Sequence, residues 1–233
     1  HNNEVWLRAS ALRFDLPTVK SIYSVGLPSI IIQSISSVMT FGMNFILAGF
    51  SETAVSVLGI YFKLQNFVFM PGFGLTSALV PIVSYNYGAA KKQRILTCTK
   101  TAMISITVIM IFGTALFQLF PGQLLALFSD GGDLARTGEP ALRIISLSFV
   151  FAGIAIVLSS LFQALGEGLH SLLMSVFRQL VLLLPIAWLL SLSGNVDLVW
   201  YSFLIAEAVS LCFALTLFRR SYNKKIKHLG GVT

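Results

Sequence analysis

The sequence is poor in charged residues. Of its 233 residues, 11% are charged, whereas a soluble domain carries about 25%. Hydrophobic residues make up 56% of the chain, and its mean hydropathy is +0.84. Because a surface in water needs more polar groups than this chain supplies, we exclude an ordinary soluble enzyme, a disordered chain and a coiled coil.

The sequence also lacks the motifs of several functional classes. It has no phosphate-binding loop of the G-x-x-x-x-G-K-S/T type, no H-E-x-x-H zinc motif and no T-V-G-Y-G filter run. Its histidines, His1, His170 and His228, are scattered along the chain. We therefore expect no enzyme, no metal and no cofactor, so the energy for any work must come from an ion gradient or a partner.

Six stretches are almost free of charge, and each is long enough to cross a bilayer, which takes about 20 apolar residues as a helix. No separate soluble domain fits in the short segments between them. The sequence predicts an all-α polytopic membrane protein with an interfacial linker or amphipathic segment at 1–19, a six-helix lobe at 20–218 and a basic cytoplasmic tail at 219–233. The six stretches are 21–51, 64–90, 101–129, 144–166, 179–196 and 198–218.

The net charge of +7 is distributed unevenly along the chain. Basic residues lie before the first span, between the second and third spans and after the sixth, whereas the other loops are mainly acidic. Since loops rich in Lys and Arg stay in the cytoplasm, we predict a multi-pass protein of the cell membrane with both termini cytoplasmic and no nucleic-acid partner. Cys98 and Cys212 then lie outside any oxidising compartment, so no disulfide is expected. The basic residues are Arg8, Arg13, Lys20, Lys91, Lys92, Arg94, Lys100, Arg219, Arg220, Lys224, Lys225 and Lys227, and the opposite loops carry Glu52, Asp130, Asp133, Arg136, Glu139 and Asp197.

Proline and glycine interrupt the predicted spans. Pro28 lies in the first span, the run Pro71-Gly72-Phe73-Gly74 in the second and Pro185 in the fifth. A proline removes one backbone hydrogen bond and can kink a helix. We expect bent or locally unwound helices, with Pro28, Pro71 and Gly72 as bending residues.

The first span carries a polar stripe of Gln33, Ser37, Thr40 and Asn44. Their spacings of 4, 3 and 4 place them on one face of a helix. Two interpretations remain open. The stripe either forms hydrogen bonds to other helices, worth about 0.6 kcal/mol per contact, or it forms the wall of a hydrated cavity.

Three ionisable residues lie within the predicted spans or directly at the edge of a charge-free stretch. Lys63 either reaches the outer interface or lines a cavity, and Arg178 serves either packing or a cavity. Glu207 is the only acid inside a span, and an intramembrane carboxylate is a candidate for binding a proton or another cation. The alternative is a structural pair with Lys63, Arg178 or a hydroxyl such as that of Ser202.

Several short segments, in this order and at these places on the spans, resemble the C-terminal six-helix lobe of multidrug and toxic compound extrusion (MATE) transporters. The resemblance covers nearly the whole chain. The segments are Gly26-Leu27-Pro28-Ser29, Tyr61-Phe62-Lys63-Leu64-Gln65, Phe69-Met70-Pro71-Gly72-Phe73-Gly74, Tyr85-Asn86-Tyr87-Gly88-Ala89, Phe162-Gln163-Ala164-Leu165-Gly166 and Arg178-Gln179.

The resemblance implies an antiporter that exports cationic amphipathic compounds in exchange for H⁺ or Na⁺. Two six-helix lobes form a V in this family, so the implied partner is a missing N-terminal lobe or a second copy of this chain. Some family members carry a glutamate in the first span of this lobe, where this chain has Gln33 to Ser37. Sodium coordination at that position is therefore not expected.

On this basis we predict two sets of site residues and keep two alternative functions. The chain could instead flip a lipid-linked precursor, since Lys63, Arg143 and Arg178 outnumber Glu207, or it could be a non-transporting membrane subunit. The predicted substrate-binding residues are Gln33, Ser37, Thr40, Asn44, Tyr61, Gln65 and Phe69, and the coupling or gating candidates are Lys63, Arg178 and Glu207.

Overall fold

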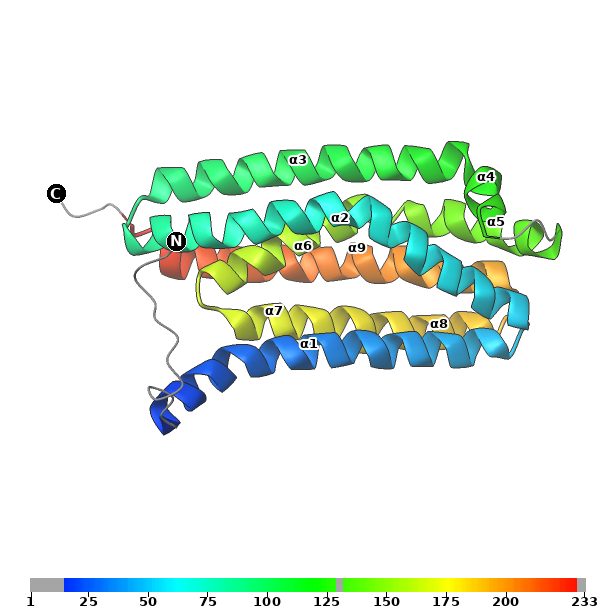
Figure 1. Ribbon diagram of the computed structural model, residues 1–233, viewed down its shortest axis with the longest axis horizontal. Helices are drawn as coiled ribbons and strands as arrows, with labels where there is room; N and C mark the ends of the chain where they lie inside the picture. The colour runs from blue at the N-terminus through cyan, green and yellow to red at the C-terminus, as the bar shows by residue number, and fades with distance from the viewer. Residues whose placement is uncertain (1–14, 129–131, 230–233) are drawn as a thin grey trace, which may run out of the picture.

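The computed structural model describes residues 15–128 and 132–229, and these residues form helices and no strands (Figure 1). Most of the predicted linker at 1–19 lies outside this part. In chain order the elements are α1 (Leu16–Ala48), α2 (Glu52–Gly88), α3 (Lys92–Leu119), α4 (Pro121–Ala126), α5 (Gly132–Ser146), α6 (Phe149–Ala164), α7 (Gly168–Val176), the π-helix η2 (Phe177–Leu183), α8 (Leu184–Ser191), α9 (Val196–Ser221) and the π-helix η3 (Tyr222–Ile226).

Five helical runs are long and apolar enough to cross a membrane, and α5 with α6, joined at a bend of 49°, form a sixth. This confirms the predicted all-α membrane architecture. The fourth crossing begins at Gly132 and not at the predicted residue 144. α6 alone has 16 residues, which span about 24 Å, whereas a hydrocarbon core is about 30 Å thick. The last turn of α5 is therefore needed to complete the crossing.

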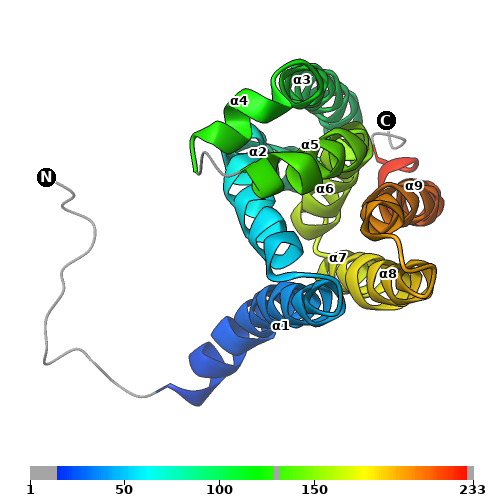
Figure 2. The same cartoon turned by 90° about the vertical axis from the view of Figure 1, so that its right-hand side faces the viewer.

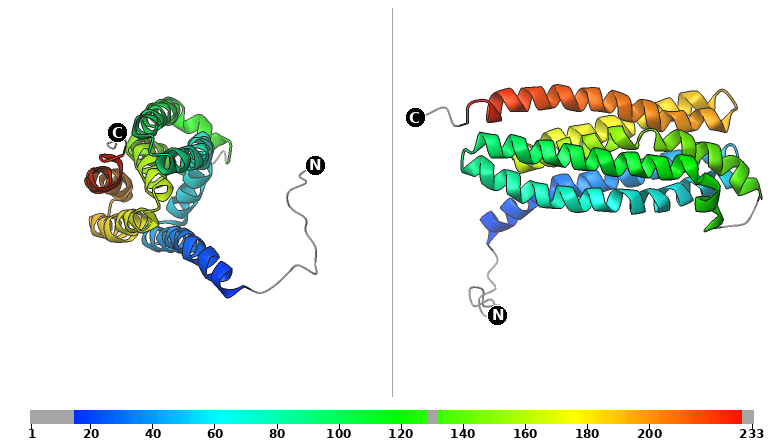
Figure 3. Two further views of the ribbon diagram at one scale, coloured as in Figure 1. Left: turned by 90° about the vertical axis from the view of Figure 1, so that its left-hand side faces the viewer. Right: turned by 90° about the horizontal axis from the view of Figure 1, so that it is seen from above.

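The helices lie side by side along the long axis of the molecule (Figures 1 and 3). α6 contacts α2, α3 and α9, while α1 packs against α7 and α8 on the side far from α3 (Figure 2). One end holds the start of α1, the α2–α3 and α6–α7 turns and the end of α9 (Figure 1). We call it the basic end, because Lys91, Lys92 and Lys225 lie there. The other is the acidic end, with Glu52 and Asp197.

Residues suited to their positions fix the ends of the helices. The Ser51 hydroxyl accepts a hydrogen bond from the Ala54 amide at 3.1 Å, and the Asn195 side chain accepts one from the Asp197 amide at 2.9 Å. Such N-caps satisfy backbone donors that have no partner inside a helix. Gly166 closes the α6–α7 turn with a φ of +72°, a conformation that glycine adopts at little cost. These caps and turns set where one crossing ends and the next begins.

The two prolines of α2 bend the helix without unwinding it. The helix is continuous from Glu52 to Gly88 with Pro71 and Pro81 inside it, and its bend is visible in Figure 1. Gly72 is buried, and a Cβ there would lie 2.5 Å from Cδ1 of Ile106. Gly72 therefore also allows α3 to approach α2 closely. Pro28 lies within α1, but its side chain falls outside the described part of the structure.

Pro185 interrupts the fifth crossing as the sequence predicts. The helix widens to a π-helix at Phe177–Leu183, and α8 starts with Pro185 in its first turn. Proline has no backbone donor, and its ring clashes with the carbonyl four residues earlier, here that of Val181. π-Helical turns accommodate such conflicts and are frequent at functional sites. This one carries Arg178 and Gln179.

The core of the acidic half is a cluster of aromatic rings around Phe149, the first residue of α6, which is fully buried. The centre of its ring lies 6.5 Å from that of Tyr61, 5.2 Å from that of Phe69 and 5.1 Å from that of Phe117. The contacts with Phe69 and Phe117 are edge-to-face and that with Tyr61 is stacked, and such aromatic pairs stabilise packing beyond the area they bury. The cluster fixes α2, α3 and α6 to one another.

Candidate functional site

An ion pair lies inside the bundle, between two crossings. Nη1 of Arg178 on η2 donates to Oε1 of Glu207 on α9 at 2.9 Å. Of the three partners considered for Glu207 from the sequence, the structure selects Arg178. A hydrogen bond between two charged groups is stronger than one between neutral groups, so this contact ties the fifth crossing to the sixth.

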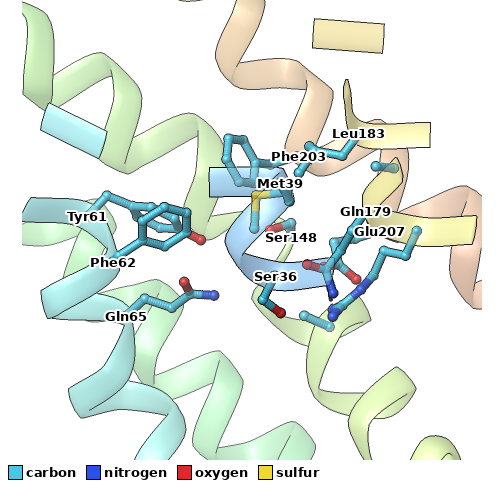
Figure 4. A pocket seen from close by; sticks show the side chains of 13 residues that line it. Ser36, Met39, Tyr61, Phe62, Gln65, Ser148, Gln179, Leu183, Phe203 and Glu207 are labelled. Atoms are coloured by element: carbon cyan, nitrogen blue, oxygen red, sulfur yellow. Dashed lines mark hydrogen bonds and ion pairs between the residues drawn. The ribbon is translucent and has the colours of Figure 1, made fainter. Parts of the chain in front are cut away.

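A cavity of about 130 Å³ opens beside this ion pair. Tyr61 and Gln65 project from α2 toward Gln179 and Glu207 on the opposite wall (Figure 4). Phe203 of α9 completes an aromatic side of the cavity with Tyr61, at a ring-centre distance of 5.7 Å. The cavity thus combines aromatic rings, amides and a carboxylate within a mostly apolar bundle.

Two buried oxygen atoms at this cavity have no hydrogen-bond partner among the described residues. They are Oε2 of Glu207 and Oε1 of Gln179, and the Gln179 side chain is 5% exposed. A buried polar atom without a partner costs free energy. These oxygens are therefore positioned to accept a donor or a cation from outside the described chain.

A second cavity, of about 260 Å³, lies next to the first. Its lining includes several hydroxyl groups, among them those of Ser160, Ser175 and Ser210. Arg178 lines both cavities. The residue that holds Glu207 therefore lies at both spaces.

The polar stripe of α1 does not line either cavity. Gln33 and Ser37 are exposed on the surface of the described bundle, and Thr40 and Asn44 are half-buried. The Ser37 and Thr40 hydroxyls donate to carbonyls of their own helix, four residues earlier. Hydrogen bonding of these hydroxyls thus needs no second helix, and a role of the stripe in substrate binding stays a prediction.

The residues predicted on α2 divide into two groups. Tyr61 and Gln65 line the first cavity. Phe69 is 4% exposed and packs against Phe73 and Phe149 in the aromatic core. In this conformation Phe69 is therefore a packing residue, and a substrate would reach it only after the helices move.

The other basic residues lie away from the ion pair. Lys63 is exposed, with Nζ 5.6 Å from the ring centre of Phe128 near the acidic end. Arg143 is exposed beside Glu139, at a shallow surface hollow near α4. Neither side chain lines the two cavities beside Arg178. The basic cavity on which the lipid-flippase alternative depends is not formed by these three residues.

Several lining residues were missed by the analysis of the sequence. Ser36 and Met39 of α1 line the first cavity, although each lies next to a member of the predicted stripe. Their signal was a helical spacing of three and then four residues, which runs from Ser36 through Met39 to the buried Met43. Ser148 lies at the break between α5 and α6, and no pattern in the sequence marked that break.

Known proteins resemble this chain over most of its length. The MatE family model matches residues 28–189. The multidrug export protein MepA of Staphylococcus saprophyticus is 27% identical over 84% of this chain and 43% of its own length, and that of Staphylococcus aureus strain MSSA476 is 26% identical over 83% and 42%. The chain thus spans less than half the length of these relatives.

Solved structures show the same fold. A crystal structure of a MATE protein in complex with MaL6 superposes with a TM-score of 0.86 at 22% identity, over 95% of this chain and 50% of that one. An inward-facing multidrug resistance MATE family transporter gives 0.84 at 23% identity, over 94% and 51%. The six-crossing bundle described here corresponds to about half of each. Together with the family match over most of the crossings, this shows that the chain belongs to the MatE family.

Proposed function

We propose that this chain is one lobe of a transporter that exports cationic amphipathic compounds in exchange for H⁺ or Na⁺. The observation that carries the proposal is the Arg178–Glu207 ion pair beside a cavity inside an apolar bundle. Charged residues within crossings are costly and usually serve transport pathways. The export of drugs by the named MepA relatives supports the same activity here.

The composition of the first cavity suits a flat cation. Tyr61, Phe62 and Phe203 supply aromatic rings, and Gln65 supplies an amide. Aromatic faces attract cations, by about 0.5–1 kcal/mol at exposed sites and by more where water is excluded. We expect Tyr61 and Gln65 to contact the substrate, and Glu207 to couple its movement to the ion gradient.

A second lobe completes the transporter in this proposal, either an N-terminal lobe or a second copy of the chain. The exposed faces of α1 and α2 carry large apolar side chains, including Phe41, Phe45 and Phe67, each more than 70% exposed. The polar stripe lies on the same helix as Phe41 and Phe45. We propose that these faces meet the second lobe or the lipid, and that both termini are cytoplasmic, with the lobe at 20–218 and the tail at 219–233.

Transport by the reconstituted protein tests this function. The protein containing this chain, in liposomes with an imposed H⁺ or Na⁺ gradient, should accumulate the cationic dye ethidium. Glu207→Gln should abolish the gradient-driven part, while Arg143→Gln, which changes an exposed residue away from the cavities, should leave it intact. Accumulation that ignores both gradients, or that survives Glu207→Gln, would contradict the proposal.

The predicted stripe has its own test. A Gln33→Ala/Asn44→Ala double variant should reduce dye accumulation if the stripe faces the substrate pathway. Unchanged accumulation in the reconstituted protein would remove the stripe from the binding site and leave the first cavity as the candidate.

A further inference from the structure

Arg178 pairs with Glu207 at the first cavity and also lines the second cavity. Its Nη1 atom pairs with Oε1 of Glu207 at 2.9 Å. A guanidinium group carries five N–H donors and no acceptor. The side chain lines both cavities, so the remaining N–H donors lie next to both spaces.

The first cavity is built to hold a positive charge even without Arg178. Oε2 of Glu207 and Oε1 of Gln179 are buried acceptors without a partner among the residues described. The oxygens of Ser36, Gln65 and Ser148 line the same space. A proton on Glu207 would provide the donor that these acceptors lack, and Na⁺ binds oxygen atoms of this kind.

The second cavity offers acceptors to a guanidinium. The hydroxyl protons of Thr76, Ser160 and Ser210 are donated to backbone carbonyls of their own helices, at 3.1, 3.0 and 3.1 Å. A hydroxyl has one proton and two lone pairs, so each of these oxygens keeps its lone pairs for another donor. These groups line the second cavity together with Arg178.

We propose that Glu207 and Gln179 form a binding site for a monovalent cation, H⁺ or Na⁺, that the guanidinium of Arg178 holds one oxygen of the Glu207 carboxylate in the present conformation, and that it moves into the second cavity when the cation binds. Arg178 acts as an internal competitor of the coupling cation. The Glu207 carboxylate stays neutralised through the exchange, because the incoming cation replaces the guanidinium, while the bundle as a whole gains one positive charge. The inference rests on the proposed function, since it assigns roles within the same site.

Among the described residues few ionisable groups lie around Glu207, which makes the test direct. Arg178 of η2 and Tyr61 of α2 are the ionisable side chains that share the first cavity with it. The residues that α1 and α6 contribute to this cavity, Ser36, Met39 and Ala152, are uncharged. A change in the carboxyl absorption of Glu207 therefore reports cation binding at this site.

Infrared difference spectroscopy of the purified chain in detergent provides the measurement. One arm lowers the pH without Na⁺, and the other adds NaCl against choline chloride at constant pH. We expect a change in the carboxyl region in the arm of the true ligand, and its loss in Glu207→Gln. A response that persists in Glu207→Gln, or the absence of any response in both arms, would overturn the proposal.

Two further sets of variants separate competition from structural support. Arg178→Gln should raise the apparent affinity for the cation about tenfold, with Arg178→Lys as a second variant that retains a charge. Ser160→Ala/Ser210→Ala, which removes acceptors from the second cavity, should lower the affinity. Arg143→Gln is the control and should leave the affinity unchanged.

The two sets of variants should shift the cation affinity in opposite directions. General loosening of the bundle would instead shift the affinity of both sets in the same direction. Equal affinity in wild type, Arg178→Gln and Arg178→Lys would overturn the role of Arg178 as competitor. Cation binding without dye transport would contradict the proposed function alone, whereas gradient-driven transport without cation binding at Glu207 would contradict this inference alone.

Discussion

Among single residues, Phe149 contributes most visibly to the packing around the site. Its ring is fully buried and contacts the rings of Tyr61, Phe69 and Phe117, which come from α2 and α3. Lipid provides little hydrophobic driving force between helices, so close packing of side chains carries more of the stability than it does in water. The Phe149 ring therefore stabilises the bundle through its contacts with these three rings.

Phe149→Ala should lower the stability of the folded chain by about 3–5 kcal/mol, because it leaves a cavity among the surrounding rings. Thermal unfolding in detergent measures the change. Phe41→Ala is the matched control, since Phe41 is 75% exposed, and it should unfold like the wild type. Similar unfolding of the two variants would contradict the assignment of Phe149 to the core.

At this scale the sequence predicts part of the site. The Tyr61-Phe62-Lys63-Leu64-Gln65 segment contains two predicted residues that line the first cavity. On α1 the cavity-lining residues Ser36 and Met39 each lie one position before a member of the predicted stripe, which is a rotation of about 100° on a helix. In a soluble helix polarity separates the inside from the outside, but in a membrane the lipid-facing and core-facing surfaces are both apolar, so the pattern does not identify the inner face.

At the scale of helices, close contacts between neighbouring crossings depend on small residues. A Cβ at Gly113 of α3 would lie 2.2 Å from Cγ1 of Val68 on α2, far inside normal contact. The branched side chain of valine has little rotational freedom in a helix. Gly113 therefore sets how closely these two crossings approach.

Gly113→Ala should destabilise the chain by about 1–3 kcal/mol through overpacking of this contact. Gly59→Ala is its control, because a Cβ at Gly59 meets nothing within 4 Å, and alanine there should stabilise the helix slightly. Thermal unfolding of both variants in one detergent compares them. The contact would lose its assigned role if Gly113→Ala unfolded at or above the wild-type temperature.

Most element boundaries follow from the sequence, and the exception has a physical cause. The charge-free stretches predict the crossings, and Pro185 predicts the interruption of the fifth. The fourth crossing extends into α5, whose polar residues include Arg136 and Glu139. A search for uninterrupted apolar runs omits such a helix, because polar residues interrupt the sequence while the apolar face packs against α2, α4 and α9.

At the scale of the whole molecule, a cluster around Glu167 connects distant segments of the chain at the basic end. Its Oε2 accepts a hydrogen bond from the Ser221 hydroxyl at 2.5 Å and lies 3.2 Å from Nδ1 of His170. Nζ of Lys225 donates to the Leu165 carbonyl at 2.6 Å and lies 3.8 Å from Oε1 of Glu167. The end of α9 and η3 are thereby attached to the α6–α7 turn.

Glu167→Ala should release η3 from this turn. A loss of about 1.4 kcal/mol would open the segment about tenfold more often. Trypsin should then cleave at Lys224 and Lys225 correspondingly faster, as followed by mass spectrometry in detergent. Glu52→Ala, an acidic residue at the other end, should leave the cleavage rate unchanged. Equal rates in both variants would contradict the attachment.

The orientation of the bundle is testable with two exposed positions at opposite ends. Ser193 lies in the α8–α9 turn at the acidic end, and His228 follows η3 at the basic end. In a chain with Cys98 and Cys212 replaced by alanine, Ser193→Cys should react with a membrane-impermeant maleimide on intact cells. His228→Cys should react only after permeabilisation, and the reverse labelling would contradict cytoplasmic termini.

α9 ends at the same end of the bundle where α1 begins (Figure 1). This has a consequence for how the unit can be duplicated within one chain. An even count of traversals brings the polypeptide back to the face it left. A tandem repeat of the unit therefore needs only a short tether and keeps the same up–down sense. A unit with an odd count would be inverted by the same duplication.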